Sequence, residues 1–265
     1  PEATAASIAG WLVAELADVS PGAGPQEVGH DAAGRWTLGA VEETLAVPAG
    51  GASPLDGVDA PVVLLTGGAR GITSAMAVAL AQRHGGHYVL VGRSPLPEGE
   101  EDPATADAAD LNALRRVMAE HSVGRSPREI EAEAQRLLKA REVRQTLAAI
   151  ADAGATVRYV PLDARDTDAL AALVAEVVAT HGKLDGVVHA AGVLEDGFLL
   201  RKSQDAFERV WDTKVAPARA LAAAVPDSVR FVAFFGSVAG AFGNKGQVDY
   251  GAANEALDKL AFALD

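Results

Sequence analysis

The feature that most constrains the fold is a regular alternation, beginning near residue 61, of short β-branched runs with longer stretches rich in Ala and Leu. The short runs predict strands at Val62–Leu65, His87–Val91, Thr156–Leu162, Gly186–His189 and Arg230–Phe235. The longer stretches predict helices at Ile72–Arg83, Arg128–Ala153, Asp168–Thr180, Asp205–Ala224 and from Val248 to the end. Strands and helices at this spacing form βαβ units, so we predict an α/β fold with a parallel sheet covered on both faces.

Five predicted strands fall short of the roughly six that a doubly wound dinucleotide-binding sheet contains. We therefore predict a Rossmann-like doubly wound parallel sheet, C-terminally incomplete and with an open edge, within residues 61–265. Residues 1–60 are predicted to form a small N-terminal helix/hairpin appendage. It would contain an amphipathic helix between Thr4 and Val19, a hairpin at Glu27–Leu38 and a Pro/Gly-rich linker.

The interval between the second and third predicted strands is longer than one crossover helix requires, with 70 positions from Arg93 to Asp163. It starts with an acidic, Pro-containing run, which predicts an exposed loop. Ser126-Pro127-Arg128-Glu129 then combines a capping box with Pro at the first helical position, which favours a helix start. We predict a helical insert at about 95–140 that packs against the rest of the domain.

The composition argues against several classes of function. The chain has 23 basic and 36 acidic residues, a formal net charge of −13, which disfavours nucleic acid or an anionic membrane as a partner. It has no cysteine, so we expect no disulfide, no thiolate metal site and no cysteine nucleophile. No apolar run reaches the roughly 18 residues of a membrane helix, and the Pro1-Glu2 start is not a signal peptide. We expect a soluble, cytoplasmic protein, cut from a longer chain.

A glycine-rich turn, Thr66-Gly67-Gly68-Ala69-Arg70-Gly71-Ile72, lies between the first strand and the first helix of the alternating region. Glycines let a backbone approach a pyrophosphate, which then lies at the helix N-terminus; the alternative is a tight turn without a ligand. After the second strand, where an NAD site has a carboxylate, the chain has Arg93 and Ser94. Arginine can bind a 2′-phosphate, with Arg70 as a second contact, so we predict NADP(H). The alternative is an ordinary surface arginine.

Four polar residues form a candidate catalytic set: Ser237, Tyr250, Asn254 and Lys214. Ser237 follows the last predicted strand, and Lys214 lies in the helix before it. Tyr250 and Asn254 are four residues apart and share one helix face. An ammonium favours the phenolate of a nearby tyrosine, which can then act as an acid–base group, and a serine hydroxyl can hold a carbonyl. Each residue alone also fits a structural role, but their order after a phosphate-binding loop favours catalysis.

The sequence resembles the short-chain dehydrogenase/reductase family in Thr66–Ile72, Asp163, His189–Gly192, Ser237 and Tyr250–Asn254. That family usually has Lys four residues after the tyrosine and Asn on the preceding helix, and here the two are exchanged. The exchange, and the run from Phe235 to Tyr250, resemble ketoreductase domains of type I polyketide and fatty-acid synthases. The glycine loop and the insert are most similar to the iterative subgroup, the polyunsaturated-fatty-acid and enediyne synthases. The resemblance covers Pro61–Asp265.

The resemblance implies NADPH-dependent reduction of a β-ketoacyl thioester, held on an acyl carrier protein, to the D-type β-hydroxyacyl thioester. Tyr250 would protonate the developing alkoxide while Ser237 orients the carbonyl. Lys214 would favour the phenolate, and Asn254 would support the proton relay. The cofactor-binding residues that it implies, with Asp163 at the adenine, are Thr66, Gly67, Gly68, Arg70, Gly71, Ile72, Arg93, Ser94, Asp163, Ala164, Ala190, Ala191 and Gly192.

On the substrate side, Leu194-Glu195-Asp196 resembles the Leu-Asp-Asp signature of D-product ketoreductases, although its middle residue departs from it. Asp196 and Gln247 are the substrate residues implied, and Phe242 stands where the opposite type has Trp. The alternative is an acidic turn before Gly197. Candidate cations for docking an acidic carrier protein, or scattered solvated side chains, are Arg201, Lys202, Arg209 and Lys245.

The resemblance also implies neighbouring synthase domains as partners. Two other functions stay open at this point. One is a non-catalytic NADP-binding scaffold fragment of such a synthase, and the other is a free-standing short-chain alcohol dehydrogenase.

Overall fold

The computed structural model describes residues 4–17, 28–31, 33–37, 42, 51–67, 69–97, 99, 101–121 and 124–264. The chain divides into two compact units, Pro1–Ala52 and Ser53–Asp265. Within the described ranges, no helix is both long enough and apolar enough to cross a membrane.

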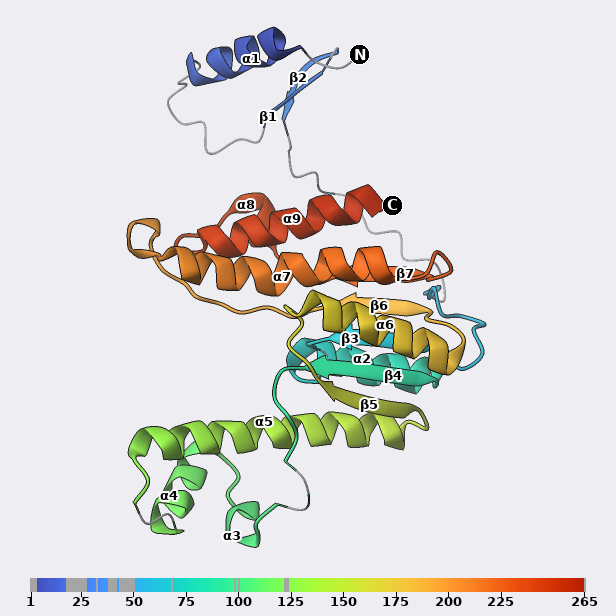
Figure 1. The fold of residues 1–265 in the computed structure, drawn as a ribbon, viewed down its shortest axis with the longest axis vertical. Helices are drawn as coiled ribbons and strands as arrows, with labels where there is room; N and C mark the ends of the chain where they lie inside the picture. Colours follow the sequence, from blue (N-terminus) through green and yellow to red (C-terminus); the bar gives the residue numbers. More distant parts are fainter. Residues whose placement is uncertain are drawn as a thin grey trace. The chain divides into compact units, whose positions relative to one another are not determined.

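The larger unit is built on a five-stranded parallel sheet in the order β5-β4-β3-β6-β7 (Figure 1). Its strands are β3 (Val62–Thr66), β4 (His87–Gly92), β5 (Thr156–Pro161), β6 (Gly186–His189) and β7 (Phe231–Phe234). The chain moves outward from β3 to β5 and then returns to the other side of β3. This reversal puts the carboxyl ends of β3 and β6 side by side, where doubly wound sheets bind ligands. The predicted Rossmann-like α/β fold is confirmed, with each strand end within one residue of its predicted position.

Helices cover both faces of this sheet because alternate residues of each strand point to opposite faces. Val63 and Leu65 pack on one face, beneath α2 (Gly71–His84) and α5 (Pro127–Asp152). Val62 and Leu64 pack on the other face of the sheet, against α6 (Thr167–His181) and α7 (Gln204–Ala224). The last helix, α9 (Val248–Leu264), packs against α7, and the short helix α8 (Val238–Phe242) packs against α9. The sequence did not predict α8, or the 3-10 turn η1 at Leu199–Arg201.

The insert between β4 and β5 is helical, with α3 (Pro103–Ala106) and α4 (Leu111–His121) ahead of the long helix α5. It has a small core of its own in which Leu114 and Met118 of α4 pack against Ile130 and Ala134 of α5. The predicted capping box is present, because the Ser126 hydroxyl accepts from the backbone N–H of Glu129 and the Glu129 carboxylate accepts from the N–H of Ser126. The C-terminal half of α5 lies against α2, so the insert reaches the glycine-rich loop.

Residues 53–60, which the sequence assigns to a linker, pack with the larger unit. Leu55 is 1% exposed and lies in the core beneath α2. The guanidinium of Arg83 on α2 donates to the carboxylate of Asp56, which fixes this segment from outside.

The smaller unit contains a helix, α1 (Ala5–Ala17), and an antiparallel hairpin of β1 (Val28–Asp31) and β2 (Gly34–Thr37). The Arg35 guanidinium binds the carboxylate of Glu15 through two hydrogen bonds of 2.6 and 2.9 Å. Hydrogen bonds from Arg35 and His30 lower the pKa of Glu15 to about 2. Because Glu15 lies on α1 and Arg35 on β2, the contact joins the helix to the hairpin. The predicted helix and hairpin are both present.

Candidate active site

The glycine-rich loop connects the central strand β3 to the N-terminus of α2. Gly67 has a φ of +71°, and a Cβ atom there would lie 3.0 Å from the carbonyl oxygen of Ala190, which follows β6. Only glycine therefore lets the two loops approach this closely. Arg70, at the N-cap of α2, makes no side-chain capping hydrogen bond. The first N–H groups of α2 are thus not capped by that side chain and can serve an anion.

A cavity of about 300 Å³ lies at this end of the sheet. It is lined by the loops that follow β3, β4, β5 and β6, as expected for a ligand at the switch point. The predicted cofactor-binding residues that line it are Gly67, Arg70, Gly71, Arg93, Ser94, Asp163, Ala164, Ala190, Ala191 and Gly192. Gly68 lies outside the described residues. Thr66 and Ile72 do not line the cavity, since Thr66 is fully buried and Ile72 is 81% exposed on the helix surface.

Thr66 instead belongs to a buried polar chain beneath the loop. Its hydroxyl lies 2.6 Å from His189 Nδ1, and His189 Nε2 lies 2.8 Å from the carbonyl oxygen of Lys214. Burial lowers the pKa of His189 to about 4, so the ring is neutral near pH 7. Because a carbonyl can only accept, Nε2 donates to Lys214, and Nδ1 accepts from the Thr66 hydroxyl. This chain couples the end of β3 to the turn of α7 that carries Lys214.

The cavity wall contains three cations from different elements: Arg70, Arg93 and Lys139. Lys139 comes from α5, in the insert, and was missed by the sequence analysis. It lies one helical turn before Val143, which also lines the cavity, and nothing in the local sequence distinguishes it from a lysine on the helix surface. Asp163, on the same wall, is bound by Arg165, whose hydrogen bonds hold the pKa of that carboxyl below its usual range.

A second contact from α5 fixes the loop itself. The Thr146 hydroxyl, buried on α5, donates to the carbonyl oxygen of Ala69 at 3.0 Å. This bond joins the insert to the loop that lines the cavity. The sequence analysis missed Thr146 because threonine has no signal within an otherwise apolar helix face.

Lys214 and Tyr250 lie together next to the cavity, although they are on different helices. The Lys214 Nζ is 5.3 Å from the centroid of the Tyr250 ring and donates to the carbonyl oxygen of Phe235 at 3.0 Å. Lys214 is only 4% exposed. Burial lowers its pKa to about 8, while Asp258 acts in the opposite direction. The ammonium lies over the face of the tyrosine ring, within the distance of a cation–π contact.

Asn254 and Ser237 flank the tyrosine. Asn254 is fully buried and its side-chain NH2 donates to the carbonyl oxygen of Tyr250 at 2.7 Å. Its Oδ1 has no hydrogen-bond partner among the described residues. Ser237 caps α8, and its hydroxyl accepts from the N–H of Ala239 at 3.2 Å. A Cβ on Gly251 of α9 would lie 3.0 Å from the Ala239 carbonyl oxygen, so glycine lets α8 and Ser237 come close to the turn that carries Tyr250.

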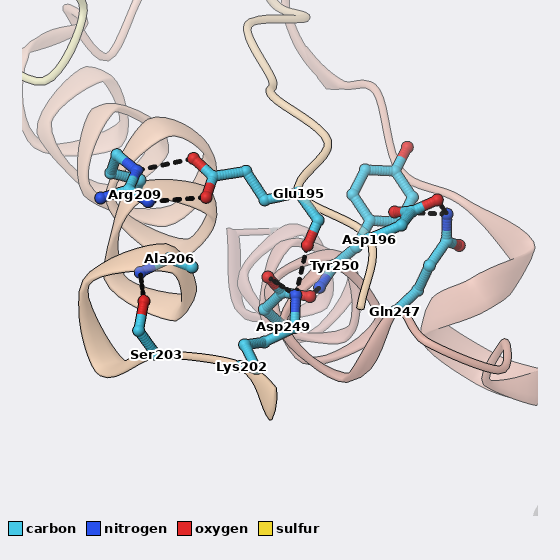
Figure 2. A network of polar contacts seen from close by, with 9 residues as sticks. All are labelled: Glu195, Asp196, Lys202, Ser203, Ala206, Arg209, Gln247, Asp249 and Tyr250. Atoms are coloured by element: carbon cyan, nitrogen blue, oxygen red, sulfur yellow. Dashed lines mark hydrogen bonds and ion pairs between the residues drawn. The ribbon is translucent and has the colours of Figure 1, made fainter. Parts of the chain in front are cut away.

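The two predicted substrate residues contact each other. The side-chain amide of Gln247 donates to both oxygens of Asp196 at 3.0 Å (Figure 2), and Gln247 precedes the helix that carries Tyr250. Two of the predicted docking cations are paired with carboxylates. Lys202 is buried against Asp249, and Arg209 is paired with Glu195, so neither is a free solvated charge.

With a ligand cavity at the switch point of a parallel sheet, the larger unit has the fold of the short-chain dehydrogenases and reductases, a class of oxidoreductases. Comparison with known families narrows this assignment. The KR domain family matches residues 61–264. The chain belongs to this family, the ketoreductase domains of polyketide and fatty-acid synthases.

Similar proteins include one curated relative and two solved structures. A polyunsaturated fatty acid synthase polypeptide of Thraustochytrium sp. is 36% identical over 214 residues, which cover 77% of this chain and 8% of that protein. An N-terminal ketoreductase from the macrolactin assembly line has a TM-score of 0.58 at 25% identity, covering 84% of this chain and 35% of the other. A ketoreductase domain from the bacillaene assembly line has a TM-score of 0.56 at 28% identity, covering 77% and 41%. The chain therefore spans a small part of the synthase that it matches.

Proposed function

We propose that this chain reduces a β-ketoacyl thioester to a β-hydroxyacyl thioester with NADPH. The observation that carries the proposal is the buried Lys214 ammonium at 5.3 Å from the Tyr250 ring, next to a cavity with the features of a dinucleotide site. A lysine buried in this way is costly to the fold, which argues for a role in chemistry.

The loops and the charged side chains that line the cavity support NADPH as the cofactor. The glycine-rich loop, including Gly67 and Gly71, lines the cavity where α2 begins. A pyrophosphate can bind there to the backbone N–H groups of the helix N-terminus. Arg93 stands where an NAD site has a carboxylate, and Arg70 and Lys139 bring two further positive charges to the wall. The salt bridge from Arg70 to Glu142 is long, at 3.5 Å, and more than two fifths of the Arg70 side chain is exposed. A 2′-phosphate would therefore meet cations from three separate elements.

When bound, NADPH supplies a hydride from its nicotinamide ring to the β-carbon of the substrate. The carbonyl oxygen takes a proton from the Tyr250 phenol, so the ketone becomes a secondary alcohol. Lys214 stabilises the phenolate that remains, and the phenolate recovers its proton from solvent. Ser237 donates to the carbonyl oxygen and orients it. The unpartnered Oδ1 of Asn254 can hold a water for this proton return.

We infer that the substrate arrives on the phosphopantetheine arm of an acyl carrier protein within a synthase. The similarity to the Thraustochytrium synthase supports this inference. Leu194-Glu195-Asp196 supports the D-type product, with Asp196 held by the side-chain amide of Gln247.

The test is NADPH oxidation, followed by absorbance, with a β-ketoacyl thioester of N-acetylcysteamine as substrate. We expect turnover by the wild-type chain, and none by Tyr250→Phe, which should keep its affinity for NADPH. Wild-type chain that binds NADPH without turning over would contradict the proposal and favour a scaffold. Preference for simple ketones over the thioester would favour an alcohol dehydrogenase.

A further inference from the structure

A buried ion pair lies beside the tyrosine and has no part in the chemistry above. The Lys202 Nζ, which follows η1, is 2.6 Å from Asp249 Oδ2 at the start of α9. The two side chains are only 3% and 1% exposed. A second hydrogen bond, of 2.5 Å, runs from the Lys202 Nζ to the carbonyl oxygen of Glu195. One buried ammonium thus joins a loop to a helix, and Figure 2 shows its bonds to Glu195 and to Asp249.

The second oxygen of the Asp249 carboxylate is also used. Asp249 Oδ1 accepts from the backbone N–H of Tyr250 at 2.9 Å. The carboxylate therefore bridges the Lys202 ammonium and the backbone of Tyr250.

The loop held by Lys202 is the one that carries Asp196. Besides the bond from Lys202 to Glu195, the Gly197 N–H donates to the Gly246 carbonyl oxygen at 2.8 Å, and Gln247 binds the Asp196 carboxylate. Three kinds of contact thus tie residues 195–197 to residues 246–249. Of these, the Lys202 contact is the buried, charged one.

An ion pair of this kind is expensive to bury. Two charges lose their hydration, and their attraction repays that loss only when the geometry is good and further hydrogen bonds are present. A well-packed apolar pair is often as stable, so stability alone does not account for a buried Lys–Asp pair. Its position between the Asp196 loop and Tyr250 gives it another use.

We propose that Lys202 and Asp249 are positioning residues that fix the Asp196 loop relative to Tyr250, and so fix which face of the substrate carbonyl is presented. This inference rests on the proposed function for its effect on catalysis. The attachment of the loop to α9 does not depend on the proposed function. Neither side chain touches the reacting atoms in this account.

The test compares three variants of the chain. Lys202→Met removes the ammonium and leaves a buried carboxylate, so the double variant Lys202→Met/Asp249→Asn is made as well, in case the single variant fails to fold. In the double variant the side-chain amide oxygen introduced at position 249 can still accept from the Tyr250 N–H. Arg209→Ala is the matched control, because Arg209 binds the side chain of the same Glu195 but is 48% exposed.

The first readout is hydrogen–deuterium exchange of the peptide that contains Gly197. We expect exchange at least about tenfold faster in the double variant and little change in Arg209→Ala, because a charged buried hydrogen bond is worth about that factor or more. Unchanged exchange in a folded double variant overturns the proposal, whether or not the chain reduces the thioester.

The second readout is catalysis. We expect the double variant to lose at least about tenfold in kcat and to give a mixed product configuration, with affinity for NADPH within about twofold of wild type. A folded double variant with wild-type kcat and configuration overturns the positioning role. If exchange rises but wild type itself makes no alcohol, the proposed function fails and the attachment of the loop stands.

Discussion

The buried Lys214 ammonium predicts a pH dependence of folding stability that a single substitution can isolate. Burial lowers the pKa of Lys214 from 10.5 to about 8 in the folded chain, against the opposing effect of Asp258. Between these two values the unfolded chain binds more protons than the folded chain, so stability rises with pH there. The free-energy cost of burying the Lys214 ammonium is therefore greatest below pH 8, and this cost falls towards zero as the pH approaches 10.5.

The magnitude follows from the two pKa values. Keeping Lys214 charged in the folded chain costs about 3 kcal/mol at pH 7, and about 2 kcal/mol of this is regained by pH 9.5. Lys214→Met has no such gain, while every other titrating group is shared with wild type. We therefore expect the difference in unfolding free energy, from urea titrations of the cofactor-free chains, to move by about 2 kcal/mol in favour of wild type between these two pH values. An equal difference at both pH values would refute the reasoning.

Three further predictions concern the cofactor, the loop and the carrier protein. Arg93→Asp should weaken NADPH binding by about ten- to a hundredfold and spare NADH, measured by nucleotide fluorescence; equal affinities of wild type for the two nucleotides would count against an NADP site. Thr146→Val should lower the unfolding free energy by about 1 kcal/mol and weaken NADPH binding, because it removes the bond to the glycine-rich loop. Thr180→Val is the control, because the Thr180 hydroxyl bonds to Glu176 of its own helix, and it should not change NADPH binding. Equal effects of the two variants on NADPH binding would show that the loop contact does not matter. Reduction of a carrier-bound substrate supplied in trans should speed up with added salt, because the chain carries −13 and the carrier is expected to be acidic; a decrease with salt would indicate a basic docking patch instead.

The strands and long helices could be predicted because their signals are local. The strands are short runs rich in apolar residues, the helices are longer stretches rich in Ala and Leu, and α5 begins at the Ser126 capping box. The helix α8 was not predicted because its five residues are too few to show a helical period. The doubly wound parallel sheet followed from the βαβ pattern and the place of the glycine loop, whereas the order of its strands comes from the structure.

The site was predictable where one segment carries a motif, and unpredictable where segments distant in sequence meet. Tyr250 and Asn254 share a helix face, and Ser237 precedes them at the end of a strand. The contact from Thr146 to Ala69 of the glycine-rich loop spans 77 positions, and no local pattern marks Thr146.

Charged side chains show the same limit more sharply. The sequence treated Lys202 as a candidate solvated cation, whereas the fold buries it against Asp249, 47 positions away. Charge alone cannot tell a solvated lysine from a paired one, because the partner is brought in by tertiary packing. Lys139 shows the converse, because a lysine that the sequence places on a helix surface lines the cavity at the carboxyl ends of the strands.

The most direct test of the central claim follows the transferred hydrogen itself. The chain is incubated with NADPH that carries deuterium at C4 of the nicotinamide, in each of the two configurations separately, and with the β-ketoacyl thioester. We predict that one of the two cofactors yields a β-hydroxyacyl thioester one mass unit heavier, with the deuterium at the β-carbon, and that Tyr250→Phe yields none. Alcohol without deuterium from either cofactor, or no alcohol while NADPH remains bound to wild-type chain, would contradict the claim.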